Sequence, residues 1–130
     1  MAAILACIFI CGENSVANKN CKAIVTAYDR EKLTKDGTLN KFIEAIDFNA
    51  EHTEFPSLRL KDSLAEMHWI MGYKDLKTGS NKGTGNEVLG VTAKDNVDKA
   101  RGKRCNFFGY EEFGAFKKFI DVWNVNKPSV

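Results

Sequence analysis

Residues 22–28 read Lys-Ala-Ile-Val-Thr-Ala-Tyr, a short, apolar and partly β-branched run that polar residues bound on both sides. Such a run is typical of a buried strand in a parallel sheet. A second run, Cys105-Asn-Phe-Phe-Gly-Tyr110, predicts another buried strand. Because helical patterns surround both runs, the sequence indicates an α/β fold.

Three segments carry those helical patterns. Residues 2–12 form the most apolar stretch, which is too short for the roughly 20 residues of a membrane span and lacks signal-peptide features. It predicts a buried helix, apolar all round because it is covered on several sides. Asp36 or Thr38 caps a second helix that ends before Phe55-Pro56 and carries Leu39, Phe42, Ile43 and Ile46. A last helix, from about Ala115 to Val125, should place on one face Phe116, Phe119, Ile120 and Trp123.

Two extended stretches, Ser63–Tyr73 and Asn86–Thr92, lie on either side of a segment rich in glycine and lysine, Lys74–Gly85. This pattern predicts two strands joined by a long flexible loop. His68 should pack in a half-buried strand, without a partner for nucleophilic chemistry. The aromatic residues Trp69, Tyr73 and Trp123 are expected in the core or at its edge.

Composition limits the classes of protein to consider. The chain has 130 residues, 44% of them hydrophobic, and two prolines, which excludes disorder and collagen and allows one domain or part of one. A net charge of +2 is too small to identify a nucleic-acid binder, so such a role must come from local patches. The four cysteines show no CxxC spacing, and we expect reduced thiols rather than a zinc site or disulfides.

Two carboxylates, Glu111 and Glu112, follow the second predicted strand. They should therefore lie at the carboxyl edge of the sheet, where ligands of α/β folds bind. In nucleoside triphosphatases, the first of such a pair holds magnesium and the second polarises the attacking water. An acidic turn at the end of a strand would give the same pattern.

Several segments, in this order, closely resemble the large subunit of tailed-phage terminases. They are Leu33-Thr-Lys-Asp-Gly-Thr-Leu-Asn-Lys-Phe42, residues 74–91, Lys99-Ala-Arg-Gly-Lys-Arg104, Tyr110-Glu-Glu-Phe-Gly114 and Trp123-Asn-Val-Asn-Lys-Pro-Ser-Val130. The resemblance implies that residues 1–130 are an interior fragment of the ATPase domain of a DNA-packaging motor. The implied fold is a partial P-loop NTPase domain of the ASCE type. It would have a mostly parallel sheet flanked by helices and would lack the strand of the phosphate loop.

The resemblance also assigns roles. Phe107–Glu111 would be the Walker B strand, with Glu111 binding the cofactor and its Mg²⁺, and Glu112 would be the catalytic glutamate for ATP hydrolysis. Glu111 stands where the family usually has aspartate, whose side chain is one carbon shorter. The implied partners are double-stranded phage DNA, the portal protein and the terminase small subunit, in the host cytoplasm and without a membrane.

No G-x-x-x-x-G-K-[ST] pattern occurs in the sequence. We therefore expect a truncated or split gene product, with the phosphate loop encoded upstream and no ATP turnover by this chain alone. A nuclease domain is missing as well. A second interpretation is a non-catalytic α/β interaction or DNA-associating domain that has lost nucleotide chemistry.

Two groups of basic residues keep two interpretations each. Arg101 and Arg104 are catalytic candidates that could reach a triphosphate in this subunit or in a neighbouring one, or they could form a basic turn before the strand. DNA phosphates are candidate ligands of three lysines that could equally belong to a solvated loop, namely Lys74, Lys77 and Lys82.

Overall fold

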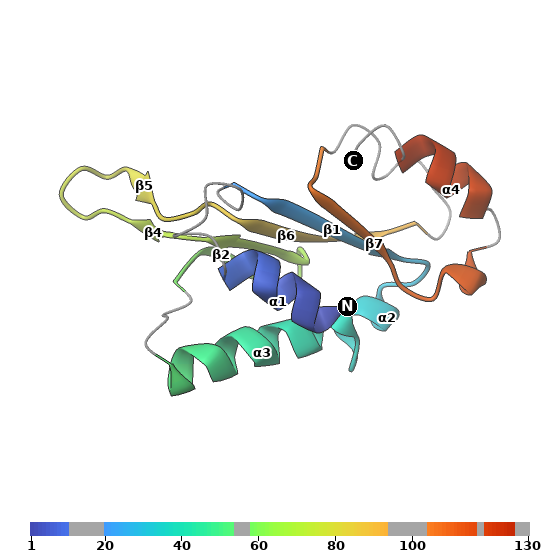
Figure 1. Cartoon of the computed structure of the whole chain (residues 1–130), viewed down its shortest axis with the longest axis horizontal. Coiled ribbons are helices and arrows are strands. Elements are labelled where there is room, and N and C mark those ends of the chain that lie inside the picture. Colours follow the sequence, from blue (N-terminus) through green and yellow to red (C-terminus); the bar gives the residue numbers. More distant parts are fainter. Residues whose placement is uncertain (11–19, 54–57, 94–103, 117–118, 127–130) are drawn as a thin grey trace.

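The computed structural model describes residues 1–10, 20–53, 58–93, 104–116 and 119–126. Helices lie on both sides of a central sheet (Figure 1), which confirms the α/β class. In chain order the elements are α1 (Ala2–Ile10), β1 (Lys22–Ala27), α2 (Glu31–Thr34), α3 (Thr38–His52), β2 (Arg59–Ser63), β3 (His68–Met71), β4 (Tyr73–Lys74), β5 (Asn81–Lys82), β6 (Glu87–Thr92), β7 (Phe107–Tyr110), the 3-10 helix η3 (Phe113–Ala115) and α4 (Phe119–Asn126).

The central sheet has five strands in the order β2-β3-β6-β1-β7. β1 runs parallel to both of its neighbours, β6 and β7, as predicted for residues 22–28. β3 runs antiparallel to β2 and to β6, and the separate β4–β5 pair is also antiparallel. The prediction of a mostly parallel sheet is therefore wrong. The reason is that a turn and a hairpin, not crossover helices, connect β2 to β3 and β3 to β6.

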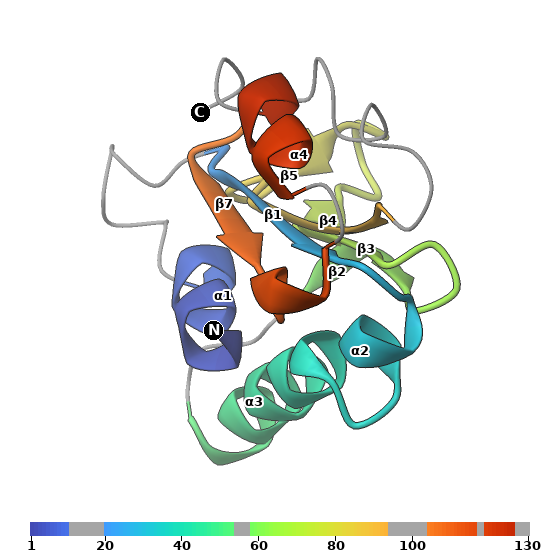
Figure 2. The same cartoon turned by 90° about the vertical axis from the view of Figure 1, so that its right-hand side faces the viewer.

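One face of the sheet is covered by α1 and α3 (Figure 2). Phe42 of α3 links the layers, because its ring packs in a T-shaped arrangement with Phe9 in α1 and with Trp69 in β3, with centroids 5.5 Å apart in both pairs. All three side chains are fully buried. The helix predicted to carry Leu39, Phe42, Ile43 and Ile46 and to end before Phe55-Pro56 is thus confirmed as α3, and so is the core position of Trp69. The cap of α3 is Gly37, not Asp36 or Thr38.

The covering of α1 differs from the prediction. Leu5 and Phe9 are fully buried against the sheet and α3, but Ile4 is 48% exposed and Cys7 is exposed. The prediction that this helix is covered on several sides is therefore wrong, and the outer side of α1 is apolar and exposed. Such a side is unusual for a helix that is apolar all round, which normally lies inside a larger core.

α4 packs on the opposite face, near the carboxyl ends of β1 and β7 (Figures 1 and 2). Val122 of α4 is buried there beside Phe116, which precedes the helix. α4 begins at Phe119 rather than Ala115, and Ala115 instead ends the 3-10 helix η3. Ile120 and Trp123 are 66% and 45% exposed, so the predicted apolar face is only partly correct.

Two further segments differ from their predictions. Residues 63–73 are not one strand, because a turn over residues 64–67 separates β2 from β3. β2 was missed because its sequence, Arg59-Leu-Lys-Asp-Ser63, is mostly polar. Residues 74–85 do not form a loop throughout. Tyr73 pairs with Lys82 and Lys74 with Asn81 in a hairpin that extends from the sheet (Figure 1).

Candidate functional site

The candidate site lies where β7 ends, beside the carboxyl end of β1. Glu111 directly follows β7, and its backbone N–H donates to the Thr26 carbonyl oxygen of β1 at 2.8 Å. At the next residue, Glu112, φ is 48°, and this left-handed conformation turns the chain from the strand into η3. Such backbone strain in a residue other than glycine is frequent at functional sites. Because of this turn, the two successive carboxylates meet different partners.

The carboxylate of Glu111 accepts a hydrogen bond from the Thr38 hydroxyl. Thr38 is the first residue of α3, and the amino end of a helix favours a nearby negative charge. Gly37 makes this placement possible, since a Cβ at this position would collide with the backbone of Lys32 and Leu33 in α2. The close approach of α3 to α2 therefore brings the Thr38 hydroxyl to the end of β7.

The carboxylate of Glu112 pairs with Lys32 of α2 instead. The Lys32 Nζ lies 3.3 Å from each carboxylate oxygen, and about half of each side chain is exposed, 52% for Lys32 and 53% for Glu112. An ion pair this exposed adds little stability, because water screens both charges. The Glu112 carboxylate can therefore exchange Lys32 for another partner at low cost.

These groups supply oxygen atoms of the kind that Mg²⁺ prefers. The described residues contain no cluster of three or more histidine, cysteine, aspartate or glutamate side chains that could hold a metal by themselves. A magnesium ion bound with a nucleotide needs only one or two carboxylates, because phosphates and water complete its shell. One oxygen of Glu111 is bonded to Thr38, and the exposed carboxylate of Glu112 is the next residue along the chain. Glu111 and Glu112 together therefore supply the one or two carboxylates that such an ion needs.

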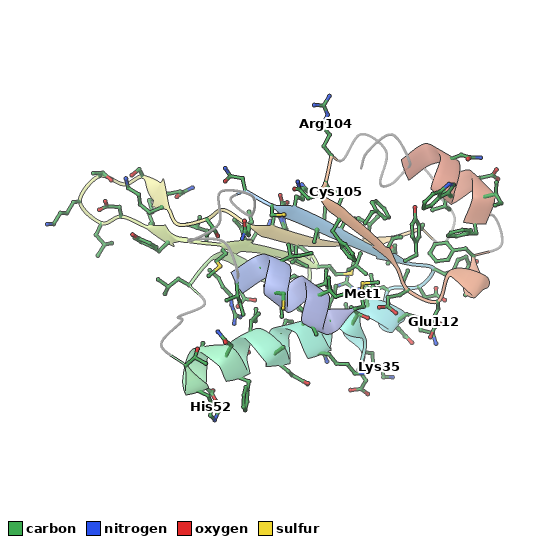
Figure 3. The ribbon with its side chains drawn as sticks, in the orientation of Figure 1. Met1, Lys35, His52, Arg104, Cys105 and Glu112 are labelled. Atoms are coloured by element: carbon green, nitrogen blue, oxygen red, sulfur yellow. The ribbon has the colours of Figure 1, made fainter. Side chains whose placement is uncertain are left out.

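The two candidate arginines are not brought to these carboxylates within the described chain. Arg101 lies outside the described residues. Arg104 is exposed before the start of β7, whereas Glu112 lies beyond the end of that strand (Figure 3). At about 3.3 Å per residue, the strand separates the two by roughly 20 Å or more.

The three candidate lysines belong to the β4–β5 hairpin, at the other end of the sheet from Glu112 (Figures 1 and 3). Lys74 lies in β4, Lys82 in β5 and Lys77 in the turn between them, and all three are exposed. The structure thus separates the carboxylates and the lysines into two surfaces.

Thr38 and Lys32 are site residues that the sequence analysis did not assign. In the sequence, Thr38 is only a candidate helix cap. Its position shortly after the carboxyl end of β1 was the available signal, because that end lies at the same edge as Glu111. No sequence pattern pointed to Lys32, since its contact depends on how α2 turns after β1.

His68 lies in β3 and is half-buried, as predicted. Its Nε2 lies 2.6 Å from the Glu87 carboxylate of β6, which Lys22 of β1 also contacts at 2.9 Å. Lys22 and Glu87 lie at the amino ends of β1 and β6, away from Glu111, and with His68 of β3 they link three neighbouring strands. We assign them a structural role.

Among the described residues, no disulfide joins Cys7, Cys21 or Cys105 to another cysteine, and Cys11 lies outside the described residues. Within the described part of the chain, every helix is too short or too polar to cross a membrane. A scan of protein-family models and searches of curated proteins and of solved structures gave no match.

Proposed function

We propose that this chain is part of the ATPase domain of a phage terminase large subunit, a motor that couples ATP hydrolysis to translocation of double-stranded DNA. The observation that carries the proposal is the position of Glu111 and Glu112. They follow a strand that pairs in parallel with β1, at the sheet edge where ligands of α/β folds bind. The fold would be that of a P-loop NTPase without its phosphate-loop strand.

The surroundings of Glu111 and Glu112 suit different roles. Glu111 is half-buried and fixed by the Thr38 hydroxyl, so it would hold Mg²⁺ at a defined position. Glu112 is exposed and only weakly held by Lys32, so it would turn to orient the attacking water. Bound Mg²⁺ and ATP would supply charge neutralisation and the transferred phosphoryl group.

The outer edge of β7 and the outer side of α1 support a larger domain. Among the described strands, β7 is at the edge of the sheet, where its backbone groups could pair with one more strand. Met1, which directly precedes α1, lies against Gly109 of β7, and α1 carries the exposed apolar side chain of Ile4. A further strand beside β7, with a segment packed on α1, would bury the edge of β7 and the outer side of α1. The phosphate-loop strand of the proposed fold would occupy this place.

The remaining parts of the proposal come from the resemblance. The cofactors would be ATP and Mg²⁺, and the partners would be phage DNA, the portal protein and the terminase small subunit, in the host cytoplasm. Arg104 would act on a neighbouring subunit's nucleotide, since it lies before β7 and far from Glu112. Arg101, which is outside the described residues, would reach a triphosphate in this subunit or in a neighbouring one.

The test joins this chain to the segment encoded upstream and measures nucleotide binding and hydrolysis separately. Glu112→Gln should keep Mg²⁺-dependent ATP binding and lower hydrolysis roughly 10²- to 10⁴-fold, as expected when a positioned base is lost. Glu111→Gln should weaken Mg²⁺-dependent binding as well. Glu44→Gln changes an exposed glutamate of α3 and serves as the control for charge. Equal loss of binding in both site variants would refute the separate roles.

The second candidate is a non-catalytic interaction or DNA-associating domain. The Lys32–Glu112 ion pair favours it, because that pair gives the second carboxylate a partner that needs no nucleotide. If neither Glu111→Gln nor Glu112→Gln alters ATP binding or hydrolysis in the joined protein, the second candidate replaces the first.

A further inference from the structure

The β4–β5 arm, residues 73–82, is a two-stranded ribbon separate from the five-stranded sheet (Figure 1). Every residue of the arm is exposed except Asp75, which is partly buried. A ribbon that projects in this way adds little to the hydrophobic core. Its exposed surface is therefore accessible to a partner.

The base of the arm is fixed by two glycines that lie against each other. A Cβ on Gly83 would be 2.8 Å from the Gly72 Cα, and both residues have positive φ, 102° and 146°. Backbone hydrogen bonds hold both sides of this crossing, from Gly72 N–H to the Leu58 oxygen at 2.8 Å and from Gly85 N–H to the Met71 oxygen at 3.0 Å. The arm therefore leaves the sheet at a defined point.

The one acidic side chain of the arm, Asp75, forms a hydrogen bond within the turn. The Asp75 carboxylate accepts a hydrogen bond from the Lys77 backbone N–H at 2.8 Å, which lowers the pKa of Asp75. The Asp75 backbone N–H also donates to the Ser80 oxygen at 2.9 Å. The negative charge thus organises the turn, and none of the three arm lysines pairs with a carboxylate of the described residues.

The lysines lie on both faces of the ribbon. Residues paired across two strands share a face, and successive residues alternate. Lys82, opposite Tyr73, is therefore on one face, and Lys74, opposite Asn81, is on the other. Leu76, in the turn, is 98% exposed. The arm thus has cations on two sides and an apolar group at its tip.

This arrangement matches a groove with phosphates along both walls. The major groove of B-DNA is about 12 Å wide and 8.5 Å deep and admits a two-stranded ribbon. A membrane surface offers its charges in one plane, which would leave one face of the ribbon unpaired. We infer that the arm enters a groove of double-stranded DNA tip first, with its lysines on the phosphates of both strands and Leu76 toward the bases. The inference deepens the proposed function and rests on it for the role of DNA.

The contacts expected are independent of base sequence, because lysine meets a phosphate as a point charge. The test measures binding of the chain to a fluorescent duplex of about 30 base pairs at several salt concentrations. Three phosphate contacts predict a slope of log K against log salt of about −2.7. Lys74→Gln/Lys77→Gln should reduce that slope by about 1.8 and weaken binding at least about tenfold at 100 mM salt.

Lys35→Gln/Lys41→Gln is the matched control, because both lysines are exposed outside the arm and the change in net charge is the same. It should weaken binding less than about twofold. Leu76→Ser should weaken binding about threefold to tenfold and leave the salt slope unchanged, since it removes apolar contact without charge. Circular dichroism checks that each variant is folded.

Equal weakening by the two double variants would overturn the inference, because net charge alone would then explain binding. Binding by Leu76→Ser equal to the parent chain would overturn tip-first insertion. Arm-dependent binding to phosphatidylserine vesicles without binding to the duplex would assign the arm to a membrane instead. None of these measurements uses ATP. DNA binding that depends on the arm, found together with no effect of Glu111→Gln or Glu112→Gln on ATP binding or hydrolysis in the joined protein, would therefore refute the proposed function. The inferred DNA contact of the arm would remain valid.

Discussion

Replacing Thr38 by valine removes one hydroxyl from the candidate site and keeps the branched shape of the side chain. Thr38 is 9% exposed, and its hydroxyl donates to the half-buried carboxylate of Glu111. A hydrogen bond to a charged group contributes roughly 1.5–3 kcal/mol, and the partial exposure of Glu111 favours the lower value. We therefore expect Thr38→Val to lower the free energy of unfolding by about 1.5 kcal/mol.

The assay is urea unfolding followed by tryptophan fluorescence, since Trp69 is fully buried. With an m-value of about 2 kcal/mol/M, the midpoint should fall by about 0.8 M. Thr38→Ser keeps the hydroxyl and should recover most of this loss. A double-mutant cycle of Thr38→Val with Glu111→Ala should give a coupling energy of about 1 kcal/mol or more, because the two groups contact each other directly.

The exposed Lys32–Glu112 pair supplies the comparison. A cycle of Lys32→Met with Glu112→Gln should give a coupling energy below about 0.5 kcal/mol, since both side chains are about half exposed, 52% and 53%. A coupling energy between Thr38 and Glu111 no larger than this would show that the hydroxyl does not fix Glu111 and would refute its separate role as metal ligand.

Three further predictions concern stability, thiols and activity. Asp62→Ala should cost roughly 1–3 kcal/mol in thermal or urea unfolding, because the Asp62 carboxylate accepts bonds from the buried Trp69 indole at 2.7 Å and from Arg59 at 2.6 Å. Burial raises the pKa of the Cys105 thiol above the ordinary thiol value of 9.0. Labelling with a thiol reagent, followed by mass spectrometry, should therefore be slower at Cys105 than at exposed Cys7 near neutral pH, and the rate at Cys105 should still be rising at pH 9.0. The purified chain alone should hydrolyse ATP no faster than a buffer blank, because its sequence contains no phosphate loop.

The sequence was sufficient for the elements with strong patterns. β1 was predictable because five of its six residues are buried, which leaves a continuous apolar run in the sequence. α3 was predictable because Leu39, Phe42 and Ile46 recur at helical spacing and all face the core. β2 was not predictable, because Arg59 and Asp62 are polar yet pair with each other at 2.6 Å in a partly buried strand.

The candidate site was predictable only in part, for a different reason. Glu111 and Glu112 directly follow an apolar strand, so the local sequence pattern was sufficient to predict their position at the edge of the sheet. Thr38 precedes Glu111 by 73 positions and Lys32 precedes Glu112 by 80 positions in the sequence. These contacts form because of how α2 and α3 turn after β1. Contacts this distant depend on tertiary packing, which no local periodicity encodes. The ribbon form of the β4–β5 arm was missed because glycines in a segment rich in lysine indicate a loop as readily as a hairpin.

The most direct measurement for the central claim is the coding sequence immediately upstream of the Met1 codon. The proposed terminase fragment predicts a frame in phase with this chain that encodes a strand followed by a G-x-x-x-x-G-K-[ST] loop. That segment would supply the backbone cradle and lysine for the phosphates that Glu111 and Glu112 require. An unrelated gene or a promoter at that place would contradict the claim and favour the non-catalytic binding domain.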